Sequence, residues 1–299
     1  MISVVPSGRF APSPTGALHL GNLRTALVAW LAARSTGSRF VVRMEDLDRV
    51  TSSVAHERAQ LADLAAIGLD WDGEVVRQSV RSARYDLAIE RLTAAGLTYP
   101  CYCTRREIAE AVRAPHPSAT GATSTDLRYP GTCRSLGRHE RRAIEVTGRR
   151  PAIRLRSNGE SITFTDRIAG LVTGTVDDVV LRRNDGVAAY NLAVVVDDAA
   201  EGVAEVVRAD DLLLSSPRQA YLARLLGGPE PIYAHVPLVL GPDGARLAKR
   251  DGAVTLADRA GRGESADDVR SLLATSLGLA EPGEPVSMAT VLDRAWLRS

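Results

Sequence analysis

The stretch of residues 9–22 constrains the fold of this chain more than any other feature, because it predicts a short strand, a tight turn and a helix start in direct succession. Two prolines in the turn disfavour helix and hold the backbone extended. From about residue 18 to 34, leucines and a tryptophan recur at helical spacing. A helix that begins directly after such a turn can hold nucleotide phosphates through its first backbone N–H groups. We therefore expect a nucleotide site that includes His19, Gly21 and Asn22.

The remainder of the chain alternates between strand and helix patterns. Further strands are expected at 39–43, 152–155, 161–166, 171–175 and 203–208, and helices at 51–67, 84–95, 217–226 and in two short segments after residue 265. The continuous apolar run at 190–198 is typical of a strand buried on both faces, which favours a parallel sheet. These patterns predict an α/β fold, with a Rossmann-type doubly wound parallel sheet, an inserted α+β domain and a short helical C-terminal region.

The domain organisation follows from where the pattern changes. Residues 1–96 and 190–258 are expected to form the two halves of the sheet domain, 97–189 the inserted domain, and 259–299 the helical tail. The inserted segment contains a Pro/Ser/Thr/Gly-rich stretch at 114–124, which predicts a loop. It also contains an arginine-rich run at 134–156. Such a run fits a solvated face or a phosphate-contacting patch equally well.

Composition excludes several classes of protein. The 299 residues are 45% hydrophobic and 24% charged, and the formal net charge is +1, so no general basic field is present for gripping nucleic acid. No apolar run approaches the roughly 20 residues that span a bilayer, and the N-terminus does not resemble a signal peptide. We therefore expect a cytoplasmic protein. We also expect a monomer, because no long heptad pattern or repeat is visible.

The single lysine of the chain is Lys249, whereas every other basic side chain except histidine is arginine. It lies between glycines in a loop-like segment, next to Arg250 and near Arg246. A lysine ammonium is a compact point charge on a flexible stem, suited to a phosphate whose charge moves during a reaction. This interpretation competes with simple compositional drift, which would leave one lysine by accident. We favour a phosphate-binding role.

The three cysteines are Cys101, Cys103 and Cys133. They are too few for a disulfide framework, and two of them are separated by a single residue. In a reducing compartment such a group is either a metal site or a set of structural thiols. Both interpretations remain open from the residues alone.

Several separated motifs give the chain a family resemblance. The segment 11–16 followed by His19-Leu20-Gly21-Asn22 resembles the nucleotide-binding signature of class I aminoacyl-tRNA synthetases, in the form used by their glutamyl branch. Matching motifs follow in the family's order at 43–48, 68–72, 190–198, 207–211 and 246–250, where the last is the family's lysine loop. The resemblance extends from about residue 8 to 258. It implies that glutamate is activated with ATP, accompanied by Mg²⁺.

The resemblance also implies roles for individual residues. The expected glutamate-binding residues are Arg9, Ala11, Ser13, Glu45, Tyr190 and Arg208. The expected catalytic residues are His19, Asn22 and Lys249, and these three with Gly21 would bind ATP. Glu45 would hold the α-ammonium of the substrate, and Arg208 would pair with its γ-carboxylate. The lysine loop departs from the family pattern because Arg246 and Ala248 replace the usual lysine and serine.

The same resemblance favours one structural zinc ion per chain, bound by Cys101, Cys103, Tyr129 and Cys133. Tyr129 is the expected fourth ligand, and His116 and His139 are its competitors. Zinc prefers thiolates in structural sites. The metal would then stabilise the part of the chain that faces nucleic acid.

The distance between Lys249 and the last residue, about 50 positions, favours one branch of the family. It is too short for the helical anticodon-binding region of a glutamyl-tRNA synthetase. The chain is therefore similar to the truncated paralogues, the glutamyl-Q tRNA(Asp) synthetases, which activate glutamate without tRNA and transfer it to queuosine at the wobble position. The expected partner is the queuosine-carrying anticodon stem-loop of tRNA(Asp). Alternatives are a minimal glutamyl-tRNA synthetase, another nucleotidylyltransferase, or a non-catalytic paralogue.

Overall fold

A seven-stranded sheet forms the centre of the protein in the computed structural model, which describes residues 5–113, 129–238 and 255–295. Its strand order is β3-β2-β1-β9-β10-β6-β7, and every neighbouring pair is parallel except β6 and β7. The strands are β1 (Ser7–Phe10), β2 (Arg39–Met44), β3 (Val76–Arg77), β6 (Ser161–Asp166), β7 (Gly170–Thr175), β9 (Val203–Ala209) and β10 (Ile232–Val236). All expected strands except that at 190–198 are present.

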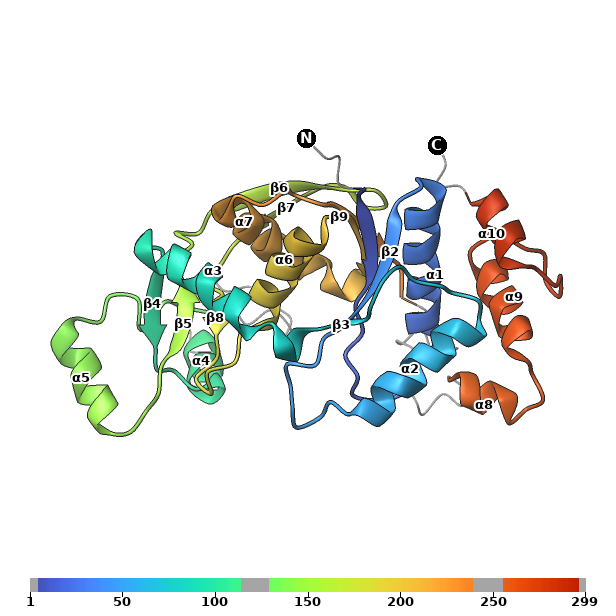
Figure 1. Cartoon of the computed structure of the whole chain (residues 1–299). Coiled ribbons are helices and arrows are strands. Elements are labelled where there is room, and N and C mark those ends of the chain that lie inside the picture. Colours follow the sequence, from blue (N-terminus) through green and yellow to red (C-terminus); the bar gives the residue numbers. More distant parts are fainter. Residues whose placement is uncertain (1–4, 114–128, 239–254, 296–299) are drawn as a thin grey trace.

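Helices cover both faces of this sheet (Figure 1). On one face lies α1 (Leu20–Ser35), next to β1, β2 and β9. On the other lie α6 (Tyr190–Glu201) and α7 (Ser216–Leu226), backed by α3 (Ser82–Ala94). A mostly parallel sheet with helices on both faces is the doubly wound architecture, so the expected α/β fold class is confirmed.

A smaller antiparallel sheet lies at the opposite end of the molecule from α1 (Figure 1). It consists of β4 (Thr98–Cys101), β5 (Ala152–Leu155) and β8 (Val180–Arg182), and it is flanked by α4 (Arg105–Arg113) and α5 (Arg138–Val146). The hairpin of β6 and β7, between β5 and β8 in the sequence, instead joins the large sheet through β10. The expected domain boundaries stay a prediction, and the loop expected at 114–124 lies outside the described residues.

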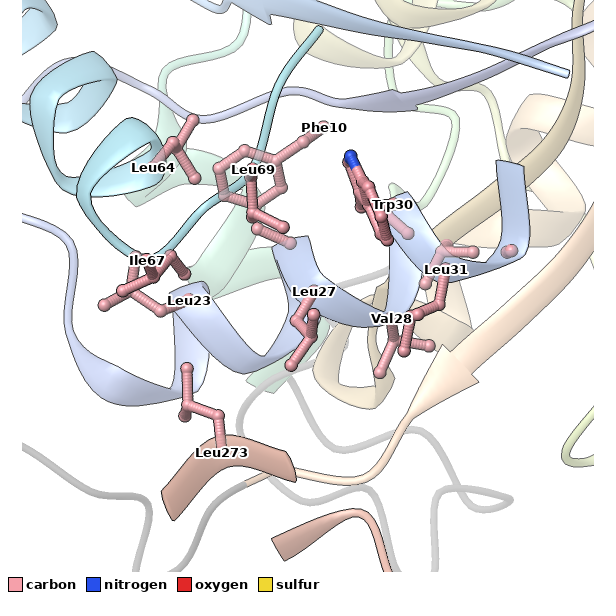
Figure 2. Packing of buried hydrophobic residues seen from close by; sticks show 14 of the residues in the cluster. Phe10, Leu23, Leu27, Val28, Trp30, Leu31, Leu64, Ile67, Leu69 and Leu273 are labelled. Atoms are coloured by element: carbon pink, nitrogen blue, oxygen red, sulfur yellow. The ribbon is translucent and has the colours of Figure 1, made fainter. Parts of the chain in front are cut away.

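The long helix α1 is buried on almost every side, as Figure 2 shows for its leucines and Trp30. It packs against Phe10 of β1, the end of α2 (Val54–Ala66), and Leu273 of α9 (Ala266–Ser276). Gly8 allows its close approach to the sheet, because a Cβ at this position would lie 3.0 Å from the Cβ of Ala33. A change of Gly8 would therefore move the helix whose first turn carries the expected nucleotide site.

The C-terminal helices α9 and α10 (Met288–Arg294) cover the outer side of α1, and the short helix α8 (Leu256–Ala260) packs against α9 (Figure 1). Ser265 begins α9 as its N-cap, because its side chain accepts a hydrogen bond from the backbone N–H of Asp268 at 3.1 Å. The two helices expected after residue 265 are thus present. Among the described residues, none of the helices combines the length and apolar character that a membrane crossing requires.

The expected strand at 190–198 is wrong, because these residues form most of the twelve-residue helix α6. The apolar run is continuous because α6 lies between the sheet and the helices α3 and α7, so most of its circumference is buried. A run of valines does not distinguish a buried helix from a buried strand. Gly202 ends the helix in the left-handed conformation, with φ of 68°, and leads directly into β9.

Candidate active site

His19 and Asn22 form the start of α1 together. The backbone N–H of Asn22 donates to His19 Nδ1 at 3.2 Å, and the backbone N–H of His19 donates to Asn22 Oδ1 at 3.2 Å. His19 is therefore the N-cap in a reciprocal capping box. Because Nδ1 accepts a hydrogen bond, a neutral ring carries its proton on Nε2. The expected placement of both residues at the N-terminus of a helix agrees with the structure.

The turn between β1 and α1 is held by a side chain that the sequence analysis did not single out, Gln60, and by the backbone of Glu45. The buried Gln60 of α2 donates its amide N–H to the carbonyls of Ser13 at 3.0 Å and Gly16 at 2.7 Å. The backbone N–H of Glu45 donates to the carbonyl of Pro12 at 2.9 Å. Helix α2 and the segment that follows β2 therefore both hold this turn in place.

Glu45 follows the carboxyl end of β2, and its side chain is 12% exposed. Burial raises the pKa of this carboxyl to about 7, although Arg43 and Arg9 attract its charge and oppose the rise. The charge of Asp198 also raises the pKa of Glu45, and the charge of Arg208 lowers it. The carboxyl is thus held close to its ionisation midpoint at neutral pH, and a cation placed beside it would favour the charged form.

A buried ion network lies behind Glu45. The fully buried Arg43 donates to Asp198 at 2.7 Å and to Glu201 at 2.8 Å, and it lies 4.0 Å from Glu45. Arg9 Nε donates to the same oxygen of Asp198 at 3.2 Å. Asp198 thus connects two arginines from neighbouring strands to α6. The motif at 43–48 therefore contains a residue that stabilises the fold, Arg43, as well as Glu45, which is expected to bind the substrate.

Arg9 and Arg208 are both nearly fully buried, at 4% and 5% exposure. They lie on the neighbouring strands β1 and β9, where Arg9 Nη1 donates to the carbonyl of Val207 at 3.0 Å. The positive charges of Arg9 and Arg208 both act to lower the pKa of Glu45 and the pKa of Tyr190. The structure therefore brings these four expected glutamate-binding residues together around the carboxyl ends of the central strands.

A cavity of about 880 Å³ opens beside this group. One part of its wall consists of the expected glutamate-pocket residues Ser13, Glu45 and Tyr190, whereas Arg9 and Arg208 lie behind the wall. Another part is formed by cysteines 101 and 103 and by five arginines, Arg105, Arg149, Arg150, Arg154 and Arg183, with Arg218 from α7. The cavity therefore connects the central sheet with the cysteine-bearing small sheet.

The three cysteines lie together as expected, with their sulfur atoms all within 4.8 Å of one another. Cys101 and Cys103 come from the end of β4, and Cys103 Sγ lies 3.5 Å from Cys133 Sγ. The hydroxyl of Tyr129 lies 3.3 Å from Cys101 Sγ and 3.7 Å from Cys103 Sγ. Of the competing histidines, His139 is exposed outside this group, and His116 is outside the described residues.

This cluster fits the chemistry of a tetrahedral zinc site. Ligands at the usual Zn–S distance of about 2.3 Å would place two sulfur atoms about 3.8 Å apart, close to the Cys103–Cys133 separation of 3.5 Å. Burial raises the pKa of the Cys103 thiol to about 12. A cation is therefore needed for this thiol to ionise at neutral pH. The residues present can hold zinc with Tyr129 oxygen as the fourth ligand.

The arginine-rich run at 134–156 separates into two groups. Arg154 is buried, with its guanidinium 3.8 Å from the centre of the Tyr129 ring, and Arg134 pairs with Asp178 at 3.2 Å. These two stabilise the small sheet. Arg149 and Arg150 are exposed and line the cavity, and Arg142 is exposed on α5. The run therefore contains arginines that hold the small sheet together and arginines that are exposed, and phosphate contact by the exposed ones stays a prediction.

The expected phosphate-binding Lys249, together with Arg246 and Ala248, lies outside the described residues. Thr255, the first described residue after that segment, forms an isolated antiparallel β-bridge with His19. Lys249 precedes Thr255 by six positions in the sequence. Thr255 therefore lies directly beside the start of α1.

The fold and this arrangement at the strand ends define the class of protein. A family profile described as tRNA synthetases class I (E and Q), catalytic domain, matches residues 7–281. The chain belongs to this family of aminoacyl-tRNA ligases. The resemblance predicted from the motifs is therefore confirmed at the level of the family.

Two curated relatives indicate which branch of the family the chain resembles. The chain is 60% identical to a glutamyl-Q tRNA(Asp) synthetase of Nocardia farcinica, with 97% of this chain and 90% of that protein covered. It is 56% identical to one of Cutibacterium acnes, with 93% and 78% covered. The predicted resemblance to glutamyl-Q tRNA(Asp) synthetases is thus also confirmed.

A solved structure extends the likeness to the fold. The structure of a glutamate tRNA ligase from Elizabethkingia meningosepticum, in complex with its amino acid, superimposes with a TM-score of 0.83 at 28% identity. The match covers 99% of this chain and 65% of that protein, so the chain spans about two-thirds of the length of that ligase.

Proposed function

We propose that the protein activates L-glutamate with ATP, without needing tRNA, and transfers the glutamate to queuosine at the wobble position of tRNA(Asp). The observation that carries this proposal is the cavity, because one space adjoins the candidate glutamate residues Ser13, Glu45 and Tyr190 and a wall of arginines, among which Arg105, Arg149 and Arg150 are exposed. The names of the two relatives at 56% and 60% identity supply the nature of the acceptor.

The amino acid would be held by charges of both signs. In the proposed pocket the Glu45 carboxylate receives the α-ammonium, and the Arg208 guanidinium receives the γ-carboxylate as a charge-assisted pair. A glutamine side chain would present amide N–H groups to the same guanidinium, and two donors facing each other lose the hydrogen bond. Arg9, Ala11, Ser13 and Tyr190 complete the pocket. This arrangement would select glutamate over its amide.

The nucleotide would bind at the start of α1. We place the phosphates of ATP against His19, Gly21 and Asn22, where the helix N-terminus favours negative charge. An oxygen of the glutamate α-carboxylate then attacks the α-phosphorus, and the bond to the bridging oxygen of pyrophosphate breaks. His19 Nε2–H can donate to a phosphate oxygen. Lys249 would stabilise the charge that develops on pyrophosphate, and Mg²⁺ would accompany the ATP.

The acceptor would enter through the arginine-lined side of the cavity. Arg149 and Arg150 are exposed there, and phosphate contacts from such side chains would position an RNA stem-loop. A hydroxyl of the cyclopentenediol of queuosine attacks the acyl carbon of glutamyl-adenylate, and AMP leaves. The product is an ester on the anticodon base.

A structural zinc ion forms the second part of the proposal. It would be bound by Cys101, Cys103, Tyr129 and Cys133, and it would hold the end of β4, which lines the cavity, against the segment around Cys133. Bound zinc stabilises such a segment because the unfolded chain has no preformed site. No step of the reaction requires this metal.

The zinc site gives a direct prediction. The purified protein is expected to contain one zinc per chain by elemental mass spectrometry, and Cys133→Ser should lose it and melt at a lower temperature. Tyr129→Phe is the matched variant, because it keeps all three thiols and should bind zinc more weakly. A metal-free protein whose melting temperature does not change on adding zinc or a chelator would argue against the site.

The acceptor is tested by transfer of labelled glutamate, with ATP, to two tRNA pools. One pool is replete in queuosine and the other lacks it. We expect label only on the replete pool, and periodate oxidation of the queuosine diol beforehand should abolish it. Equal labelling of both pools would instead indicate charging at the acceptor end of tRNA, as in a minimal glutamyl-tRNA synthetase. Absence of any glutamate-dependent pyrophosphate exchange would indicate a non-catalytic paralogue.

A further inference from the structure

A chain of three buried polar side chains runs across the large sheet and ends on Arg208. His235 Nδ1 lies 2.6 Å from Asp166 Oδ2, and Arg208 Nε donates to His235 Nε2 at 3.0 Å. Asp166 and His235 are each 2% exposed. The three residues lie on the adjacent strands β6, β10 and β9. Neither Asp166 nor His235 belongs to the motifs that carry the family resemblance.

Asp166 determines which nitrogen of His235 carries the proton. Its Oδ1 accepts hydrogen bonds from the backbone N–H groups of Ile168 at 2.9 Å and Ala169 at 2.8 Å, so the carboxylate is fixed by the turn after β6. A carboxylate only accepts, so the proton of the imidazole lies on Nδ1. Nε2 then presents its lone pair to Arg208.

The charges around His235 keep this ring neutral. Burial and the nearby Arg208 lower the pKa of the imidazole, and Arg9 acts in the same direction, while Asp166 opposes the shift. A protonated ring would direct an N–H at the N–H of Arg208 Nε. The geometry and the charges therefore favour the same tautomer.

Other neighbours hold the remaining edges of the Arg208 guanidinium. Nη1 donates to Gln219 Oε1 at 2.7 Å and Nη2 donates to Ser216 Oγ at 2.7 Å, with a longer contact of 3.5 Å from Nη2 to the Leu212 carbonyl. With the bond to His235, three of the five N–H groups have partners at 3.0 Å or less. The plane of the guanidinium is therefore fixed before any substrate arrives.

All of these acceptors are neutral. Within the described part of the chain Arg208 has no ion pair. By contrast, the neighbouring Arg9 forms an ion pair with Asp198 at 3.2 Å, and Arg43 forms one with the same carboxylate at 2.7 Å. A carboxylate at the position of His235 would orient Arg208 equally well, but it would neutralise its charge. A neutral histidine orients the guanidinium and leaves the full positive charge for an incoming anion.

We propose that Asp166 and His235 are positioning residues for Arg208, and that they set the preference of the pocket for a carboxylate over an amide. This inference rests on the proposed role of Arg208 in binding glutamate. It assigns to the hairpin of β6 and β7 a share in substrate selection. His235 acts by keeping a lone pair on Nε2, and Asp166 acts by keeping the proton on Nδ1.

Two substitutions of His235 test the roles of its two ring nitrogens separately. His235→Asn keeps an N–H that can donate to Asp166 and removes the acceptor for Arg208. His235→Gln places an amide oxygen near the position of Nε2 and keeps that acceptor. In glutamate-dependent ATP–pyrophosphate exchange, we expect His235→Asn to raise the KM for glutamate by about tenfold or more, with kcat changed by less than about threefold. His235→Gln should stay within about threefold of the parent protein.

The preference for glutamate over glutamine gives a readout that a general loss of packing would not change. It should fall about tenfold in His235→Asn and be largely retained in His235→Gln. The KM for ATP should be the same in both. Thermal unfolding of both variants verifies that they are folded.

Asp166→Asn provides a second route to the same effect. Its oxygen can accept from the N–H groups of Ile168 and Ala169, and its amide then donates to His235 Nδ1. The proton moves to Nε2, where it opposes Arg208, so the glutamate KM should rise as in His235→Asn. If Asp166→Asn does not fold, the two His235 variants decide the question alone.

The outcomes distinguish this inference from the proposed function. If the parent protein shows no glutamate-dependent exchange, the proposed function itself fails. If the parent is active and folded His235→Asn matches it in KM and in amino-acid preference, the positioning role is overturned. It is equally overturned if a folded His235→Gln is as impaired as His235→Asn, because the acceptor for Arg208 would then not matter.

Discussion

Replacing Arg43 with methionine is expected to lower the free energy of unfolding by about 3–5 kcal/mol. The guanidinium is fully buried, donates to Asp198 and Glu201, and lies 4.0 Å from both Glu45 and Asp197. Methionine fills much of the same volume but removes the cation that these four carboxylates share. Among the described residues, Asp198 then keeps only Arg9 as a cationic partner, and Asp197 and Glu201 keep only Arg81. Buried negative charges with too few cations cost more than the lost hydrogen bonds alone. Urea denaturation at neutral pH, followed by circular dichroism, measures the change.

Arg34→Met is the matched control for this experiment. Arg34 also pairs with two carboxylates, Asp72 at 2.6 Å and Asp70 at 3.1 Å, but these lie near the surface, with side chains 38% and 73% exposed. Water screens such pairs, so we expect a loss below about 1 kcal/mol. Similar losses in both variants would mean that the buried network does not stabilise the fold as argued.

The second large effect concerns Glu45. Glu45→Gln is expected to lower kcat/KM for glutamate by about a hundredfold or more, because the α-ammonium loses a buried charged partner. The variant should also remove a pH dependence of the parent. The pKa of Glu45 is raised to about 7 in the free protein. The ammonium requires the carboxylate form, so kcat/KM of the parent should fall about tenfold per pH unit below 7.

The sign of the stability effect is opposite to that of binding. A carboxyl with a raised pKa holds its proton more tightly in the folded than in the unfolded protein. Its contribution to stability is therefore full below the unfolded pKa and is lost as the pH rises from about 4.5 through about 7. Glu45→Gln should thus melt no lower than the parent at pH 8 while losing activity.

Glu74→Gln, at an exposed position just before β3, serves as the control for both measurements. It should keep the parent's activity, pH profile and melting temperature. If Glu45→Gln kept the acid limb of the pH profile, another group would be responsible for it. If it kept full activity with glutamate, Glu45 would not be the ammonium partner.

The start of the sheet domain could be predicted from sequence because local patterns agreed there. Residues 9–22 combine two prolines, a helix start and a regular apolar repeat, and the structure follows each of these signals through β1 and α1. At 190–198 the only signal was an apolar run, which a buried helix and a buried strand share. Length and the glycine at 202 were the signals that could have identified α6.

Several residues of the candidate site could be placed near one another from the sequence for a similar reason. Glu45, Tyr190 and Arg208 lie in or beside recognisable motifs, and the three cysteines are close in the structure as their types suggested. The supporting residues Gln60, His235 and Asp166 have no such signal, because each acts through neighbours that are far away in the sequence. A polar residue inside a buried strand, such as His235 in β10, is the feature that could have indicated one of them.

The pairing of β1 has a consequence for the order in which the protein can fold during synthesis. Ser7 of β1 pairs with Val203 of β9, 196 positions later in the chain (203 − 7). The ribosome therefore releases the first strand long before its inner neighbour exists. Until then β1 can pair only with β2, and the edge that later meets β9 stays open. The strand that carries Arg208 thus joins β1 late in translation, and contacts of such long sequence separation favour slow folding.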